Sequence, residues 1–234
     1  MQRFKTVIAL LLIAVCLFSS GCIKSQDTTQ SAPFEEQELD TALAIVIDLS
    51  GSFSSLWDDK AYKLFLDISD RFFQGAMGTE TRLVISQLSG SDQVLLFEGR
   101  PSELRKRFRS PEELAQFLKE NADASSSRVY ESTRRTLDYV ATLPGVGPET
   151  KVLTCIFSDM LDSGIEPQGQ HAAEQQLKQS LRRYRERGGA LALYYVAESE
   201  RGRWTDLLQE AGFPTGHYLI ESGLTSSPAL PQFE

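Results

Sequence analysis

Three oxygen-bearing side chains alternate along the segment that follows the first apolar run of the folded part of the chain. Asp48, Ser50 and Ser52 are each separated by one residue, and alternate residues of an extended or gently turning segment point the same way. One carboxylate and two hydroxyls would therefore converge, a set that suits a hard cation such as Mg²⁺ or Mn²⁺. The alternative is that Asp48 and Ser50 only cap the helix that follows.

The element that must position this segment is the apolar run 42–47. A run of six apolar residues rich in Ile and Val indicates a strand that is buried on both faces, as in the middle of a parallel sheet. Asp48 would then lie at the carboxyl end of a central strand, where open α/β sheets bind their ligands. A second carboxylate, Asp159, follows the apolar run 152–157, so we expect Asp48 and Asp159 to face each other across the crevice.

Strand-like runs alternate with helical patterns throughout residues 41–220, which we interpret as one domain. Only five residues, 89–93, separate the second strand from the third, too few for a crossover, so these two strands must form an antiparallel hairpin. The pattern predicts an α/β fold with a doubly wound, mostly parallel six-stranded sheet, one antiparallel edge strand and helices on both faces. We expect strands at 42–47, 82–88, 94–98, 152–157, 191–196 and 217–220, and helices at 56–73, 111–120, 130–143, 171–187 and 203–211.

The Asp-x-Ser-x-Ser pattern at 48–52 resembles the metal-ion-dependent adhesion site of von Willebrand factor type A (vWA) domains, a Rossmann-like fold. The hairpin agrees with this resemblance, because a vWA domain has its single antiparallel strand at this point in chain order. Asp159 matches the second aspartate of the family, which usually stands between Thr and Gly. Ser158 and Met160 take those two places here, so the turn is expected to differ in shape.

The third element of the family site is a threonine at the start of a helix, and its best match is Ser127, which precedes the expected helix 130–143. A serine hydroxyl can ligate a metal equally well, but without the methyl group its rotamer is less constrained. The alternative is that Ser127 caps this helix, which it could do while also serving as a ligand.

The resemblance implies a site for Mg²⁺ or Mn²⁺ formed by Asp48, Ser50, Ser52, Ser127 and Asp159, partly through water. It also implies metal-dependent binding of a protein partner that offers a Glu or Asp to the ion, in adhesion or as a scaffold. One alternative keeps the fold and makes the metal site vestigial, since Ser127 and Met160 depart from the family pattern.

A Mg²⁺-dependent phosphohydrolase is a further alternative, with an aspartate at a strand end as the nucleophile. The phosphatase-like pattern requires a second Asp two residues after the first, where this chain has Ser50. The sequence contains no phosphate-binding Walker loop and no Gly-x-Ser-x-Gly elbow, and its two histidines, His171 and His217, are not near the strand ends that matter. We therefore expect no enzymatic activity.

Residues 1–21 have the pattern of a signal for export. Arg3 and Lys5 precede an apolar core of 12 residues, 7–18, which is too short to span a bilayer as a permanent helix. Small residues then lead into Cys22, which resembles the lipid-attachment cysteine of a bacterial lipoprotein; ordinary secretion with cleavage near Gly21 is the alternative. The polar run that follows predicts a flexible tether that extends to residue 40. Residues 221–234 contain several Ser and Pro residues, and we expect them to form a loose tail.

The expected location is the bacterial cell envelope, with the domain facing the periplasm or the exterior. Ile23 stands where an Asp would retain a lipoprotein in the inner membrane of enteric bacteria, which favours the outer membrane. Removing the signal, with Arg3 and Lys5 and no acidic residue, changes the formal net charge from −8 to −10. Such an acidic chain is a poor candidate for binding nucleic acid or an anionic membrane surface, so the lipid is its expected membrane contact.

The three cysteines leave no disulfide within the domain. Cys16 lies in the signal core, Cys22 is the expected lipid site, and Cys155 lies within the apolar run 152–157. We interpret Cys155 as a small buried core residue. The one basic cluster, residues 105–109, has helical spacing and is interpreted as a solvated face.

Overall fold

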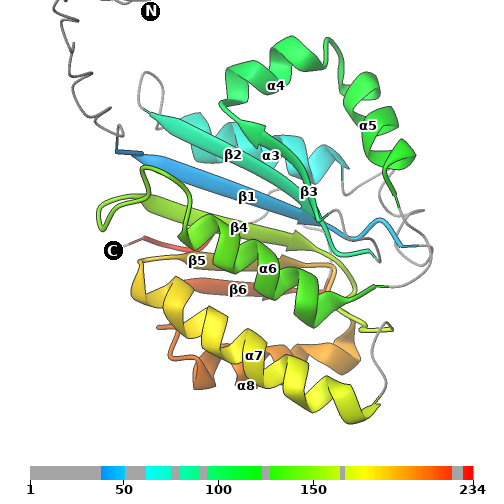
Figure 1. Cartoon of the computed structure of the whole chain (residues 1–234), viewed down its shortest axis with the longest axis vertical. Coiled ribbons are helices and arrows are strands. Elements are labelled where there is room, and N and C mark those ends of the chain that lie inside the picture. The colour runs from blue at the N-terminus through cyan, green and yellow to red at the C-terminus, as the bar shows by residue number, and fades with distance from the viewer. Residues whose placement is uncertain are drawn as a thin grey trace, which may run out of the picture. The chain divides into compact units, whose positions relative to one another are not determined.

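A six-stranded β-sheet lies at the centre of the computed structural model, which describes residues 38–50, 62–74, 80–89, 94–122, 127–163, 167–222 and 229–233. The strand order is β3-β2-β1-β4-β5-β6, and every neighbouring pair is parallel except β2 and β3, which are antiparallel (Figure 1). The predicted sheet, with its antiparallel edge strand, is therefore confirmed. The strands are β1 (Thr41–Ile47), β2 (Thr81–Gln87), β3 (Leu95–Gly99), β4 (Lys151–Phe157), β5 (Ala190–Tyr194) and β6 (Tyr218–Glu221).

Several predicted features lie outside the described residues. They are the signal peptide, Cys22, most of the tether, the first part of the helix expected at 56–73, and Ser52. Within the described part of the chain, no helix combines the length and the apolar content that crossing a bilayer requires.

The described helices begin and end close to the predicted positions in most cases, apart from α4, for which no helix was predicted. They are α3 (Tyr62–Gln74), α4 (Pro101–Arg107), α5 (Pro111–Glu120), α6 (Val129–Ala141), α7 (Pro167–Glu186) and α8 (Glu198–Glu210). Two start earlier than expected, α7 by four residues and α8 by five. The first turn of α8 is polar and mostly exposed, so it carries no apolar spacing that would reveal a helix.

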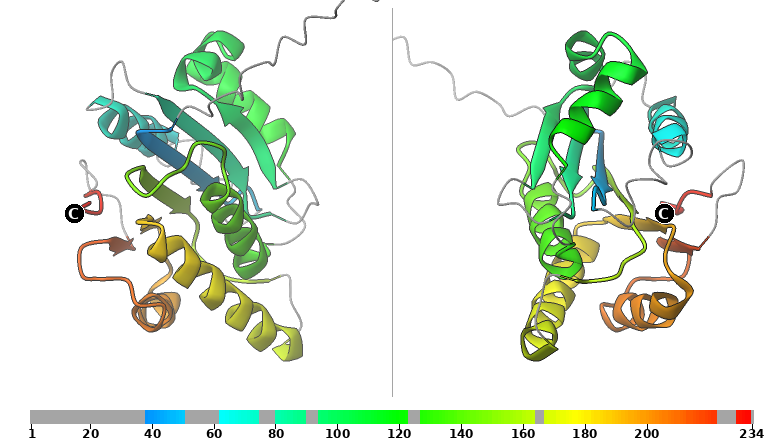
Figure 2. Two further views of the ribbon diagram at one scale, coloured as in Figure 1. Left: turned by 60° about the vertical axis from the view of Figure 1, so that its left-hand side comes forward. Right: turned by 90° about the vertical axis from the view of Figure 1, so that its right-hand side faces the viewer.

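The central strand β1 is buried along its whole length, as predicted. Because side chains alternate along a strand, its residues divide between two hydrophobic cores. Ala42, Ala44 and Val46 belong to the first core, which α6, α7 and α8 cover. Leu43, Ile45 and Ile47 belong to the second core, which lies beneath α3 and α5. Figure 2 shows α3 on one face of the sheet and α6 with α7 on the other.

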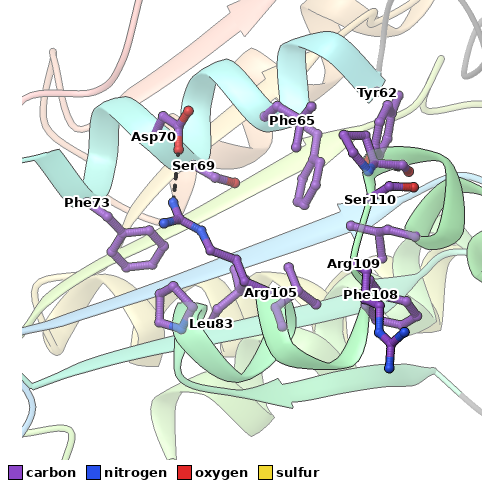
Figure 3. A pocket seen from close by; sticks show the side chains of 15 residues that line it. Tyr62, Phe65, Ser69, Asp70, Phe73, Leu83, Arg105, Phe108, Arg109 and Ser110 are labelled. Atoms are coloured by element: carbon purple, nitrogen blue, oxygen red, sulfur yellow. Dashed lines mark hydrogen bonds and ion pairs between the residues drawn. The ribbon is translucent and has the colours of Figure 1, made fainter.

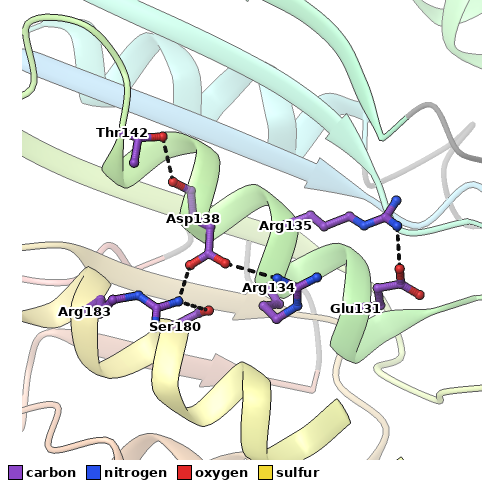
Figure 4. A network of polar contacts seen from close by, with 7 residues as sticks. All are labelled: Glu131, Arg134, Arg135, Asp138, Thr142, Ser180 and Arg183. Carbon is purple, nitrogen blue, oxygen red and sulfur yellow. Dashed lines mark hydrogen bonds and ion pairs between the residues drawn. The ribbon is translucent and has the colours of Figure 1, made fainter.

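Polar contacts join α6 to α7 on the outer surface of the first core (Figure 4). Asp138 of α6 accepts a hydrogen bond from Arg183 of α7 at 2.8 Å and forms a second ion pair with Arg134 at 3.3 Å. Ion pairs at such partly exposed positions each contribute only about 0–1 kcal/mol. Apolar packing beneath them, including Leu137 and Leu181, therefore dominates the stability of this helix pair.

Within the tail 221–234, which we expected to be loose, residues 229–233 make defined contacts with the domain. Tyr194 Oη donates to the Ala229 carbonyl at 2.8 Å, the Gln232 amide donates to the Gly216 carbonyl at 2.8 Å, and the Phe233 ring packs 6.1 Å from that of Phe72 on α3. Residues 229–233 thus cover part of the second core. The composition concealed this because the apolar residues that make the contacts are few and separated by polar ones.

Cys155 is fully buried in the second core, in agreement with its predicted structural role. Burial raises the pKa of its thiol far above the usual value, and the neutral thiol is a poor nucleophile. We expect an alkylating reagent to leave Cys155 unmodified in the folded chain and to modify it after denaturation, as measured by peptide mass spectrometry. Equal labelling in both states would contradict this burial.

Candidate metal-binding site

Asp48 is fixed at the carboxyl end of β1 between two neighbouring strands. Its amide donates to the Phe157 carbonyl of β4 at 2.9 Å, and the Leu88 amide, after β2, donates to the Ile47 carbonyl at 2.9 Å. The backbone around Asp48 is therefore held by the sheet on both sides. The side chain is completely buried, with an exposed fraction of 0%.

Three serines from separate segments donate to the Asp48 carboxylate. The Ser50 amide and the Ser127 hydroxyl donate to Oδ1, at 3.0 Å and 2.9 Å, and the Ser158 hydroxyl donates to Oδ2 at 2.7 Å. All three residues are buried. The structure thus brings together three of the predicted site residues, Asp48, Ser50 and Ser127, and adds Ser158 from the end of β4.

The charge of Asp48 has no basic partner. Among the described residues no lysine, arginine or histidine forms an ion pair with it, and its three donors are neutral groups. Buried charges in proteins are normally paired with an opposite charge or coordinate a metal. The environment of Asp48 therefore favours a cation close to it.

The second predicted aspartate, Asp159, directly follows Ser158 and is only half-buried. Its Oδ1 accepts a hydrogen bond from the Leu161 amide at 3.0 Å, and its carbonyl accepts one from the Ala197 amide, after β5, at 2.9 Å. These bonds fix Asp159 at the same carboxyl edge as Asp48, where the sequence placed it, although the hydrogen bonds of the Asp48 carboxylate come from serines.

Met160, which stands where the vWA pattern usually has Gly, has a left-handed backbone conformation. Its φ of +64° lies in the left-handed region, which is uncommon for a residue with a side chain. The Met160 amide donates to Ser158 Oγ at 2.9 Å, and its side chain is buried in the first core. The backbone turn at Met160 is therefore left-handed, and packing of the side chain offsets the strain.

The segment that carries Ser127 is held by the loop after β4. The Ser127 amide donates to Ser163 Oγ and the Ser163 amide donates to the Ser127 carbonyl, both at 3.0 Å. On its other side, Ser127 forms an antiparallel bridge with Ser89, after β2. The Ser127 side chain is therefore directed at Asp48 by backbone contacts to two separate loops.

The N-cap residue of α6 is Arg128, whose side chain makes no capping hydrogen bond, and the acceptor for the first turn comes from Asp162 and not from Ser127. Asp162 Oδ2 accepts a hydrogen bond from the Tyr130 amide in the first turn of α6 at 3.2 Å, whereas the Ser127 hydroxyl donates to Asp48. The contact between Asp162 and Tyr130 has no local signature in the sequence, because 32 residues separate the two partners and only the tertiary fold brings them together.

Replacing Asp162 tests this arrangement. Asp162→Ala should lower the free energy of unfolding by about 1 kcal/mol, the usual cost of losing a helix cap, as measured by chemical denaturation. Asp162→Asn retains an acceptor oxygen and should lose less. Wild-type stability in Asp162→Ala would show that the contact does not cap the helix.

Ser158 and Ser163 are the site residues that sequence reasoning did not assign. Ser158 had one available signal, since it directly follows an apolar strand beside Asp159, but we read it only as a departure from the vWA pattern. Within the described residues no three His, Cys, Asp or Glu side chains gather closely enough to hold a metal. A metal bound here would therefore depend on hydroxyl oxygens together with carboxylates.

Solved structures show what the fold is similar to. The pilus adhesin SpaC from Lactobacillus rhamnosus GG, in its open conformation, aligns with 79% of this chain at 8% identity and a TM-score of 0.50. A mutant of the PilB minor pilin from Streptococcus sanguinis aligns with 82% at 12% identity and a TM-score of 0.50. Manganese-loaded TRAP protein from Plasmodium vivax aligns with 79% of this chain and 68% of its own at 11% identity, with a TM-score of 0.48.

SpaC and PilB have the vWA fold, in agreement with the sheet order described above, and at such identities the likeness shows the fold alone. The alignments cover 28% of the SpaC chain and 59% of the PilB chain, so this chain matches less than two thirds of either protein. No protein-family model and no curated protein matches the chain.

Proposed function

We propose that this chain is an adhesion or scaffold protein that binds a protein partner through a divalent cation, Mg²⁺ or Mn²⁺, at Asp48. The observation that carries the proposal is the buried Asp48 carboxylate, which receives three hydrogen bonds from neutral serine groups and has no basic partner in the described part of the chain. A divalent cation would neutralise this charge without a lysine or arginine.

The residues fit a hard cation, since every side chain offered is an oxygen donor. Asp48, Ser50, Ser127 and Asp159 would hold the ion, with Ser52, which lies outside the described residues, completing the first loop. A bound cation supplies a positive centre that accepts a carboxylate oxygen from a Glu or Asp of the partner.

The chain itself supplies a rigid setting for this ion. Ser127 is fixed by Ser163 and by the bridge to Ser89, and Asp48 by β4 and the segment after β2. Because the hydroxyls are neutral, Asp48 and Asp159 contribute the only negative charges from these residues. Their two charges would balance a dication without an excess of negative charge that would repel an acidic partner. Burial of Asp48 strengthens the attraction between the cation and a partner carboxylate by lowering the local dielectric.

A binding role is favoured over catalysis by the chemistry of the described residues. His171 is exposed on α7, and His217 precedes β6 at the edge of the sheet opposite to Asp48. The serines around Asp48 donate to its carboxylate, and no histidine forms a hydrogen bond with them in the described part of the chain, as the serine of a Ser–His pair requires. We therefore propose that the site binds and does not catalyse.

The location proposed is the bacterial cell envelope, with Cys22 lipidated and the domain on the periplasmic or outer side, most simply of the outer membrane. A pilus adhesin and a minor pilin among the structures of similar fold support a role at the cell surface. Both are longer chains, so their complete activities are not expected of this one.

A partner capture with and without metal tests the proposal. The full chain with Cys22→Ser, immobilised and exposed to an envelope extract, should retain a partner in Mg²⁺, release it in EDTA and retain none when it carries Asp48→Ala. The exposed substitution Asp206→Ala on α8 is the matched control and should bind as wild type does. Capture that persists in EDTA and in Asp48→Ala would indicate a metal-free scaffold, and metal-dependent phosphate release from a phosphoester would indicate the hydrolase.

A further inference from the structure

A pocket of about 430 Å³ lies on the face of the sheet that α3 covers, between α3 and the α4–α5 pair (Figure 3). Its walls are mainly apolar and include Phe65, Leu66, Phe73, Leu104 and Phe108. Small-molecule sites typically have volumes of about 300–1,000 Å³ and a mostly apolar lining with a few polar groups. The pocket fits that description and is separate from the carboxyl edge that carries Asp48.

The apolar lining is only partly covered by the described residues. Leu66, Phe73, Leu104 and Phe108 are only partly buried, although all four pack against the second core. Burying apolar surface is favourable by roughly 25 cal/mol per Å². An apolar ligand that fills the space between the helices would therefore gain free energy from side chains that are already in place.

The polar groups of the pocket indicate that its ligand also carries a polar group. Ser69 Oγ, on the side of α3 that faces the pocket (Figure 3), is buried and has no hydrogen-bond partner among the described residues. Leaving such a hydroxyl unpaired is unfavourable. A ligand oxygen inside the pocket would satisfy it.

The charged groups at the pocket indicate the sign of the ligand. Arg105 and Arg109 line it together with a single acid, Asp70. Arg105 reaches across to Asp70 with an N–O distance of 3.6 Å (Figure 3), and both side chains are largely exposed. Such an exposed ion pair is weak, so Arg105 can exchange Asp70 for the carboxylate of a ligand.

We propose that this pocket binds a small apolar carboxylate, a molecule with an acyl chain or similar apolar body and one anionic end. The apolar body lies between α3 and α4, and the carboxylate lies near Arg105 and Ser69. This site is independent of the metal site. Its basic residues, Arg105 and Arg109, belong to the cluster 105–109, which we interpreted from the sequence only as a solvated face.

Two probes with the same chain length and opposite charge test the proposal. Decanoate and decyltrimethylammonium are titrated calorimetrically, below their micelle-forming concentrations, into the full chain with Cys22→Ser, so that no detergent competes. Decanoate should bind saturably at one site, and at least tenfold more tightly than the cation. Absence of saturable decanoate binding, or equal affinity for the two probes, would overturn the proposal.

Variants locate the binding in the pocket. Arg105→Glu, at an exposed position, should weaken decanoate roughly tenfold and strengthen decyltrimethylammonium, whereas Lys106→Ala on the same helix is the control and should change neither. Ser69→Phe, which fills the pocket, should abolish decanoate binding in a chain that still melts cooperatively. Asp48→Asn should leave decanoate binding intact, so failure of the metal site and failure of this pocket are distinguishable. Wild-type binding in both Arg105→Glu and Ser69→Phe would refute the pocket as the site.

Discussion

Asp48→Asn is expected to make the metal-free chain more stable and to abolish its response to Mg²⁺. The buried carboxylate is hydrogen-bonded but has no basic partner in the described part of the chain, and burying a charge is unfavourable unless it is also paired with an opposite charge. Asn removes the charge and keeps the shape. Its oxygen can accept from Ser50 and Ser127 as Oδ1 does, and its amide can donate to the Ser158 hydroxyl, which can rotate to accept.

Thermal melting with and without metal measures both effects. In EDTA the variant should melt above wild type, and in excess Mg²⁺ only wild type should gain stability, because a ligand stabilises only a chain that binds it. Asp206→Asn on the exposed side of α8 is the charge-matched control and should follow wild type in both conditions. A variant that is less stable than wild type in EDTA would show that the Asp48 charge is compensated without a metal.

The second large effect is expected at Trp204, where replacement by Ala should destabilise the fold by about 3–5 kcal/mol. Trp204 is fully buried and is the largest side chain of the first core. Its ring stacks on Tyr130 at the start of α6, with 5.8 Å between centroids, and Arg203 lies 5.1 Å above the Tyr130 ring. The substitution therefore leaves a cavity beside the helix that follows Ser127.

Chemical denaturation of Trp204→Ala and Trp204→Phe measures this contribution. Trp204 Nε1 has no hydrogen-bond partner among the described residues, so Phe loses area but also removes an unpaired donor, and its cost should be smaller than that of Ala. A loss below 1 kcal/mol in Trp204→Ala would show that α8 is not packed on α6 as described.

The sheet could be predicted from the sequence because its strands have a distinctive pattern of residue types. Runs such as 42–47 and 152–157 are apolar throughout, and the short connection at 89–93 permits only an antiparallel hairpin. The start of α8 could not be predicted, since residues 198–202 are polar and exposed. Residues 229–233 were also missed, because their contacts with Gly216 and Phe72 depend on the completed fold.

The candidate site could be predicted in part for a similar reason. Asp48, Ser50 and Asp159 stand directly after strands, so strand order alone places them at one edge. The position of Ser127 required the family resemblance, since nothing local directs its hydroxyl to Asp48. The roles of Ser158 and Asp162 depend on tertiary hydrogen bonds to Asp48 and Tyr130, which have no signature in the local sequence.

Calorimetric titration of Mg²⁺ and Mn²⁺ into the full chain with Cys22→Ser tests the metal site most directly. It is made with and without excess acetate, which supplies the carboxylate that a partner would offer. We predict saturable binding of one ion to wild type, tightened by acetate, and no binding to Asp48→Ala or Asp159→Ala. No binding to wild type at millimolar metal even with acetate, or equal binding to wild type and Asp48→Ala, would contradict a metal-dependent adhesion site at Asp48.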